Sequence, residues 1–249
     1  MGRLTRAVAA TSALVALGAP LAACGSSDDP TSAAPAAVDL GPAVTAPETP
    51  STGPVSADTL QAALPTAADL PTGFARLPAL ADPTPQPGDE PAPDRSTTNP
   101  TRCANVADTV ARQAPGSAAA AEANFTGPGF ASIDVDAASY TGSGAANAFA
   151  AAQATLRECT TFTGTDADGT PVQYRIEPLA QPTVGDASTA IRLTTTSEGF
   201  TLVSDAVLAV VGSTVVQVIA TGPDGTDGDL ATGVARTTVD RVHAASPPR

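Results

Sequence analysis

The chain has 249 residues, with 25 acidic side chains against 12 arginines, and its formal net charge is −13. So acidic a chain repels phosphate backbones, which argues against a nucleic-acid partner. It contains no lysine, no tryptophan and one histidine, so a Schiff base, a Ser-His-Asp triad or a zinc site lacks its usual side chains. We expect no metal and no cofactor.

Residues 1–23 are predicted to form a lipoprotein signal peptide. Two arginines precede an apolar run that is too short for a comfortable membrane span. The run ends in Leu21-Ala22-Ala23-Cys24, which resembles a bacterial lipobox, where the cysteine thiol receives a diacylglyceryl group and becomes the first mature residue. We therefore expect a lipid on Cys24 to hold the protein at the extracytoplasmic face of the cell membrane. The alternative is an ordinary signal peptide cut after Ala23.

The segment 24–55 is rich in proline, serine, threonine and alanine and predicts a disordered linker. A short helix is expected from Ser56, a favourable N-cap, and Gly73 and Phe74 lead into a short strand. Residues 79–99 are Pro-rich and acidic and predict a long loop inside the domain. A disordered insertion is one interpretation of this loop, and a mobile lid is the functional alternative.

The middle of the chain predicts two helices with a strand hairpin between them. A helix is expected from Pro100, because Cys103, Val106, Ala107, Val110 and Ala114 recur at helical spacing. Alternating side chains around a turn at residues 126–129 predict a hairpin, with Ile133 and Val135 on the opposite side of their strand from Asp134 and Asp136. A second helix follows over residues 143–159, with Phe149, Leu156 and Cys159 on one face.

The last third predicts strands and a closing helix. Strands are expected near residues 172–176 and 191–194, and two more flank Gly212-Ser213, which suits a type II′ hairpin turn. A helix is expected over residues 229–243, followed by a disordered tail at 244–249. The prediction is a single α+β domain over residues 56–243, a mainly antiparallel sheet packed with two or three helices.

Two cysteines remain once Cys24 is set aside. In an exported protein an even pair most simply forms a disulfide, so we expect Cys103 and Cys159 to be bonded to each other. Two buried free thiols are the alternative. A catalytic cysteine would need a histidine partner, and the single histidine, His243, lies near the C-terminus.

The order of several segments resembles a known family. "LPTAADLPTGFARL", a helix with cysteine, a hairpin, "LRECTTFTG" and "VLAVVGSTVVQVIATG" follow one another as in actinobacterial sensor-domain lipoproteins related to the extracellular domain of PknH-type mycobacterial Ser/Thr protein kinases. The resemblance implies an antiparallel sheet with helices, a cleft, helix-linked disulfide bonding and a ligand-sensing role. The sequence shows no kinase, so a signal would have to pass through a partner, and no cysteines remain for a second disulfide.

These observations favour a lipid-anchored extracytoplasmic binding or sensor module for an unknown envelope ligand, and not an enzyme. Candidate ligand-binding residues are Arg175, Arg192 and Tyr174 on neighbouring strands, where the arginines could capture a carboxylate or phosphate. One alternative is a carrier with a hydrophobic or lipid ligand between sheet and helices. A second is a cell-envelope hydrolase that uses carboxylates alone.

Overall fold

The computed structural model describes residues 38–48, 53–78 and 94–246. All described residues belong to one compact unit, residues 37–249. The predicted signal peptide, Cys24, the first part of the predicted linker and most of the Pro-rich loop lie outside the described residues.

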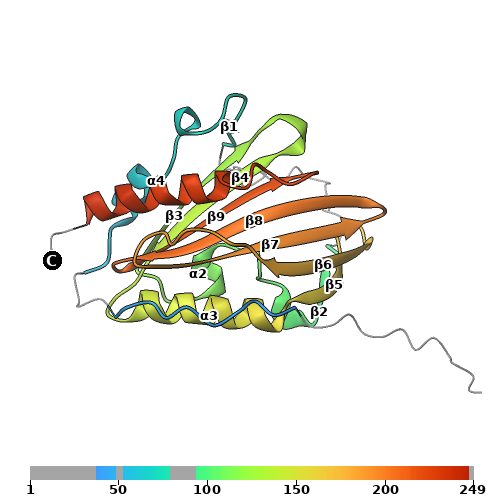
Figure 1. Ribbon diagram of the computed structural model, residues 1–249, viewed down its shortest axis with the longest axis horizontal. Helices are drawn as coiled ribbons and strands as arrows, with labels where there is room; N and C mark the ends of the chain where they lie inside the picture. The colour runs from blue at the N-terminus through green and yellow to red at the C-terminus, as the bar shows by residue number, and fades with distance from the viewer. Residues whose placement is uncertain (1–37, 49–52, 79–93, 247–249) are drawn as a thin grey trace, which may run out of the picture. The chain divides into compact units, whose positions relative to one another are not determined.

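The centre of the fold is a nine-stranded sheet in the order β1-β3-β4-β9-β8-β7-β6-β5-β2. Every neighbouring pair is antiparallel, and Figure 1 shows the long central strands side by side. The strands are β1 Ala75–Arg76, β2 Thr97–Asn99, β3 Ala119–Thr126, β4 Ser132–Ser139, β5 Thr161–Thr165, β6 Pro171–Pro178, β7 Ala187–Ser197, β8 Phe200–Val211 and β9 Thr214–Gly222.

Helices cover both faces of this sheet (Figure 1). The helices α1 (Ala57–Ala63) and α4 (Leu230–Ala245) pack on one face, and α2 (Val110–Gln113) and α3 (Gly144–Glu158) pack on the other. Three short 3₁₀ turns accompany them: η1 Ala67–Asp69, η2 Thr101–Cys103 and η3 Pro128–Phe130. None of the helices in the described ranges is long and apolar enough to cross a membrane.

Alternation along the strands divides the apolar side chains between the two faces. The α1/α4 face buries the larger core, which includes Phe125, Ile133, Val207 and Val218. The opposite face holds two smaller cores, one under α3 around Phe149 and Val215 and one around the two cysteines, Ile176 and Leu193. The sheet is therefore buried on both faces over much of its area, which explains the long valine runs of β8 and β9.

The predicted α+β class and several of its elements are confirmed. β3 and β4 form the predicted hairpin, and β8 and β9 pair from Val211↔Thr214 outward around Gly212-Ser213. Gly212 has a φ of +57°, a conformation that favours glycine and fits the first position of the predicted turn. The helices α3 and α4 match their predicted positions within about two residues at each end.

The predicted continuous helix from Pro100 is wrong. The chain makes the turn η2, then irregular turns, and only the four residues of α2 are helical. Asp108 explains the break, because its Oδ1 accepts a hydrogen bond from the Thr109 N–H at 2.8 Å and so replaces a helical backbone bond. Thr109 itself is extended, with a ψ of 149°.

Two further segments differ from expectation. β5 was not predicted, and it joins the sheet between β6 and β2, with β2 lying inside the predicted Pro-rich loop. Residues 38–48, expected in the disordered linker, lie against α3. The Gln153 amide donates to the Val44 carbonyl and accepts from its N–H, both at 2.9 Å, and Ala46 is buried. These amide bonds give the segment a fixed path that its composition did not indicate.

Candidate functional site

The most distinctive part of the fold is the irregular stretch 101–114, here called the bridging segment, which crosses the sheet face beside α3. Its first end is fixed by a disulfide between Cys103 and Cys159, so the predicted pairing is confirmed. Cys103 and Cys159 are 1% and 0% exposed and pack with Val106 and Leu156. The bridging segment is thus tied covalently to the C-terminal end of α3.

The second end of the bridging segment rests on a polar cluster of the buried Asp136 and Gln217 and the half-buried Asp108 and Gln113. Asp136 on β4 accepts from the Val110 N–H at 2.8 Å and from the Gln217 amide at 3.2 Å. Gln217 on β9 also donates to the Asp108 carbonyl at 2.9 Å and accepts from the Gln113 amide at 2.8 Å. Side chains of two central strands therefore hold the backbone of the bridging segment.

The carboxyl of Asp136 has an unusual environment. It is 8% exposed, and this burial raises its pKa to about 7, against the hydrogen bonds from the Val110 N–H and Gln217 that lower it. Nearby Glu122 and Asp108 raise the pKa further because they add like charge. Asp136 can therefore gain or lose a proton near neutral pH inside a packed cluster.

Tyr140, the residue after β4, supports the end of α2. Its hydroxyl donates to the Ala114 carbonyl at 2.8 Å. Burial, with the charge of Asp136 as a smaller cause, raises the Tyr140 pKa to about 12, so the phenol remains a neutral hydrogen-bond donor at physiological pH.

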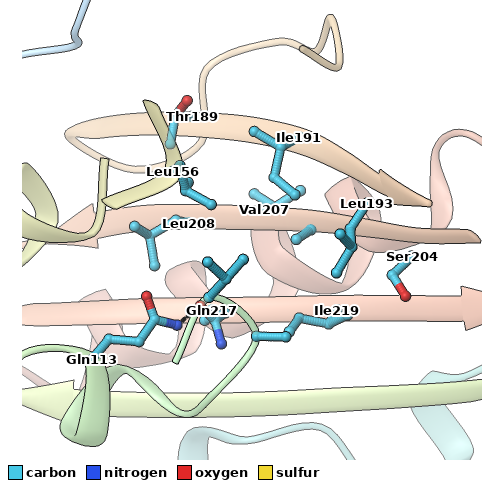
Figure 2. Close-up of a pocket in the computed structure, with 13 residues that line it drawn as sticks. Gln113, Leu156, Thr189, Ile191, Leu193, Ser204, Val207, Leu208, Gln217 and Ile219 are labelled. Carbon is cyan, nitrogen blue, oxygen red and sulfur yellow. Dashed lines mark hydrogen bonds between the residues drawn. The ribbon is translucent and has the colours of Figure 1, made fainter. Parts of the chain in front are cut away.

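A cavity lies between the bridging segment and the sheet (Figure 2). Its volume is about 30 Å³, which is room for two or three water molecules. Figure 2 shows Ile191 and Leu193 of β7 and Ile219 of β9 around it, with Gln113 and Gln217 together at one end. Most of the wall is apolar, and its polar members are Gln113, Gln217, Thr189 and Ser204.

The structure places two of the predicted ligand-binding residues, the arginines, on one sheet face and Tyr174 on the other. Arg175 and Arg192 project from the sheet face that α4 partly covers. Arg175 makes an exposed ion pair with Glu177 at 2.9 Å, and Arg192 pairs with Asp205. Tyr174 points to the opposite face and stacks on Phe162, with ring centroids 4.4 Å apart. None of the three lines the cavity of Figure 2.

Other sequence features remain outside this site. Among the described residues, no group of three or more histidine, cysteine or acidic side chains could hold a metal ion. His243 is exposed near the end of α4. Cys24, the predicted lipidation residue, lies outside the described part of the chain.

The sequence reasoning missed the polar cluster of Asp136, Gln113 and Gln217. Two signals were available: Asp136 lies on the strand face opposite Ile133 and Val135, and Gln217 is the single amide inside the apolar stretch "TVVQVIAT". A buried polar side chain in such a run normally has a structural or functional partner. Gln113 could not be found this way, because the broken helix hid its orientation.

The chain is similar to known proteins in sequence and in fold. The family described as PknH-like extracellular domain matches residues 55–241. The crystal structure of the extracellular domain of PknH from Mycobacterium tuberculosis is similar with a TM-score of 0.59 at 17% identity, covering 77% of this chain and 98% of that one. A putative uncharacterized protein from Mycobacterium smegmatis covers 83% of this chain and 90% of its own at 16% identity, and its TM-score of 0.31 is too low for a structural argument. No curated protein matches significantly.

Proposed function

Because the chain belongs to the family of PknH-like extracellular domains, which function outside the cytoplasm, we propose that it is a lipid-anchored sensor module that binds a ligand of the cell envelope. The lipid on Cys24 would hold the domain at the membrane. The ligand would bind under the bridging segment and be read by a partner protein. No nucleic acid and no cofactor take part.

The observation that carries this proposal is the cavity of Figure 2, with its apolar walls and a pair of amides at one end. Ligand sites are typically concave and mostly apolar, with a few placed polar groups that orient the ligand. Gln113 and Gln217 supply such groups through their amide oxygens, which keep acceptor capacity, because both amide nitrogens already donate within the cluster. The chemistry fits an uncharged or weakly polar ligand with an apolar portion, which also favours the hydrophobic carrier as a second candidate.

The small volume of the cavity links binding to movement. A ligand group larger than a few waters has to displace the bridging segment from the sheet. The segment is anchored by the disulfide at one end and by hydrogen bonds to Asp136 and Gln217 at the other. The hydrogen-bonded end is the one that can release, and a ligand that favours the released arrangement shifts the population toward it. This gives a sensor two states that a partner can distinguish.

We favour binding over hydrolysis, although Asp136 and Glu122 are cross-strand neighbours. Each oxygen of the Asp136 carboxyl already accepts a hydrogen bond, from the Val110 N–H and from Gln217. A general acid or base must instead reach a reacting group within hydrogen-bond distance. Turnover of a cell-wall substrate that is lost in an Asp136→Asn variant would overturn this choice.

The proposal is tested by filling the cavity. Ala206 lines it from β8, and Ala206→Leu places three further carbon atoms in a cavity that has room for a few waters. Nile red should show a saturable rise in fluorescence with the wild-type protein, and the variant should weaken this binding about tenfold or more. Ala151→Leu, on the exposed side of α3, is the matched control and should bind like wild type.

A second measurement identifies the natural ligand. Native mass spectrometry of protein purified from its own producer should show an added mass that is absent from Ala206→Leu. Equal Nile red binding by both variants and wild type, together with no added mass, would reject the cavity as the binding site.

A further inference from the structure

A second concave feature lies along β3, apart from the cavity of Figure 2. This edge groove has a volume of about 360 Å³ and is lined by Gln61 of α1, Thr109 and Ala111 of the bridging segment, Ala120, Ala121 and Glu122 of β3, and Asp136 and Ala137 of β4. α1 packs on one face of the sheet and α2 on the other. The edge groove therefore has β3 as its floor and a helix on each side.

Among residues 38–48, 53–78 and 94–246, the floor of the groove is a strand edge with only a short partner strand. In the described part of the chain, β1 is the strand beside this edge, and its ladder with β3 covers only Phe125 and Thr126. The Leu77 N–H then donates to the Asn124 carbonyl at 2.8 Å, and the Arg76 guanidinium reaches the Glu122 carbonyl at 3.3 Å. Both bonds show that alternate residues of β3 direct their backbone groups outward.

Alternation extends this orientation along the strand. Since N–H and C=O of one residue point to the same side of an antiparallel strand, Ala120 presents both groups to the edge groove. Glu122 presents its N–H, because its carbonyl accepts from Arg76. Both residues are exposed. An open edge flanked by helices is the geometry in which a protein accepts an extended peptide as an added strand.

The charge of the groove indicates the kind of peptide. Glu122 and Asp136 are direct cross-strand neighbours and line the same side of the groove. The described residues that line the groove include no cation. The nearby Arg112 is paired with Asp108 at 3.2 Å, and Arg76 adds one positive charge at the β1 end, where it donates to the Glu122 carbonyl. A lysine or arginine side chain of an added strand would thus meet the exposed carboxylate of Glu122, whereas both oxygens of the buried Asp136 carboxyl already accept hydrogen bonds.

We propose that the open edge of β3 binds an extended, lysine- or arginine-bearing peptide segment of a partner protein as an additional strand. A second copy of this chain fits less well, because pairing two β3 edges brings Glu122 of each copy close to the other and joins two chains of net charge −13. The site is separate from the cavity, so the two proposals can fail independently.

The test uses the full-length protein in mild detergent and a capped peptide of alternating threonine, valine and lysine. A matched peptide carries glutamate in place of lysine, and a third has methylated backbone nitrogens on the residues that would pair. The lysine peptide should bind at least about tenfold more tightly than either, because it alone supplies both charge and backbone donors. Hydrogen exchange should slow at the amides of Ala120 and Glu122.

Variants of β3 separate the two contributions. Ala120→Pro removes one outward N–H at an edge position where proline is tolerated, and Glu122→Gln removes one charge. Each should weaken the lysine peptide about tenfold. Ala120→Val keeps the N–H and should change binding by no more than about twofold. Ala151→Leu, on the exposed side of α3, should leave peptide binding unchanged.

Several results would overturn the proposal. If the lysine and glutamate peptides bound equally well, the charge of Glu122 would play no part in binding. If the methylated peptide bound as well as the lysine peptide, binding would not occur by strand addition. Exchange protection away from residues 119–124 places the peptide elsewhere. Self-association that Ala120→Pro abolishes would make a second copy the occupant instead.

Discussion

Arg192 on β7 donates two hydrogen bonds to the carboxylate of Asp205 on β8, from Nε at 2.7 Å and from Nη2 at 2.8 Å. The two residues are direct cross-strand partners. The side chain of Asp205 is 1% exposed, whereas that of Arg192 is 39% exposed. Arg192 therefore neutralises a buried charge, and its main role in this structure is to stabilise the fold.

The first prediction follows from this pair. Arg192→Gln leaves the Asp205 carboxylate buried without its cation and should lower the free energy of unfolding by roughly 2 kcal/mol, below the value for a fully buried pair because water reaches the arginine. Arg175→Gln breaks an exposed pair and should change the free energy of unfolding by less than about 0.5 kcal/mol. Urea denaturation compares the two variants. Equal stabilities would show that Asp205 finds another partner.

The second prediction concerns the disulfide. It joins residues separated by 56 positions, so its removal frees a long loop in the unfolded chain. The double variant Cys103→Ala and Cys159→Ala should lose about 4 kcal/mol of stability in the chain-entropy picture. Reduced wild-type protein should lose a similar amount. Before reduction, a thiol reagent added to the denatured Cys24→Ser protein should label no cysteine, and stoichiometric labelling would contradict the bond.

The third prediction is a pH dependence set by Asp136. Its pKa is raised from 3.8 to about 7 in the folded protein. Between about pH 4 and pH 7 the folded protein keeps a proton that the unfolded chain has released, so stability falls as the pH rises and levels off above about pH 7. The loss is on the order of 4 kcal/mol. The charged or titratable groups that interact with Asp136 are Glu122, Asp108 and Tyr140.

Asp136→Asn tests this dependence, because asparagine imitates the protonated acid. Denaturation curves at about pH 5 and pH 8 should differ much less for this variant than for wild type, and the variant should be the more stable protein at about pH 8. Asp134→Asn, two residues earlier on the same strand face, is the control. Burial raises the Asp134 pKa as well. If Asp134→Asn reduced the pH dependence of stability more than Asp136→Asn, then Asp134 and not Asp136 would be its source.

The fourth prediction concerns the anchor. Cys24→Ser should release the protein from the membrane fraction, because a covalent lipid is the attachment that the sequence indicates and the acidic surface gives no electrostatic attraction to anionic lipid. Ultracentrifugation after a high-salt wash measures the distribution. Retention of the variant in the pellet would mean that another element holds the protein.

Strand and helix positions could be predicted where periodicity was strong. The β8–β9 hairpin has long apolar strands and a glycine turn, and α3 repeats its buried side chains at helical spacing over four turns. The helix predicted from Pro100 had the same spacing, but local hydrogen bonding by Asp108 ended it. Short-range competition of this kind is difficult to weigh from periodicity alone.

Most of the candidate site could not be predicted from the sequence. The cluster joins Asp136 to Gln217 and to the Val110 N–H, and these contacts depend on which strands become neighbours. Arg175 and Arg192 lie on the opposite side of the sheet from Tyr174, and the sequence did not show which side contains a cavity. Arg175 pairs with Glu177, two residues away on the same strand. Arg192 pairs with Asp205 on β8, and this partner can be identified only once the strand order is known.

The pairing of β4 with β9 has a consequence for the order of folding. Asp136 and Gln217 lie 81 positions apart. β9 is central in the sheet but comes last of the described strands along the chain. The β3–β4 hairpin can form early from local contacts, but it has no neighbour on its inner side until nearly the whole chain has been synthesised. Sheets that depend on distant contacts fold slowly. The β3–β4 hairpin must therefore wait with its apolar face uncovered, and during this interval the nascent chain is most exposed to aggregation and proteolysis.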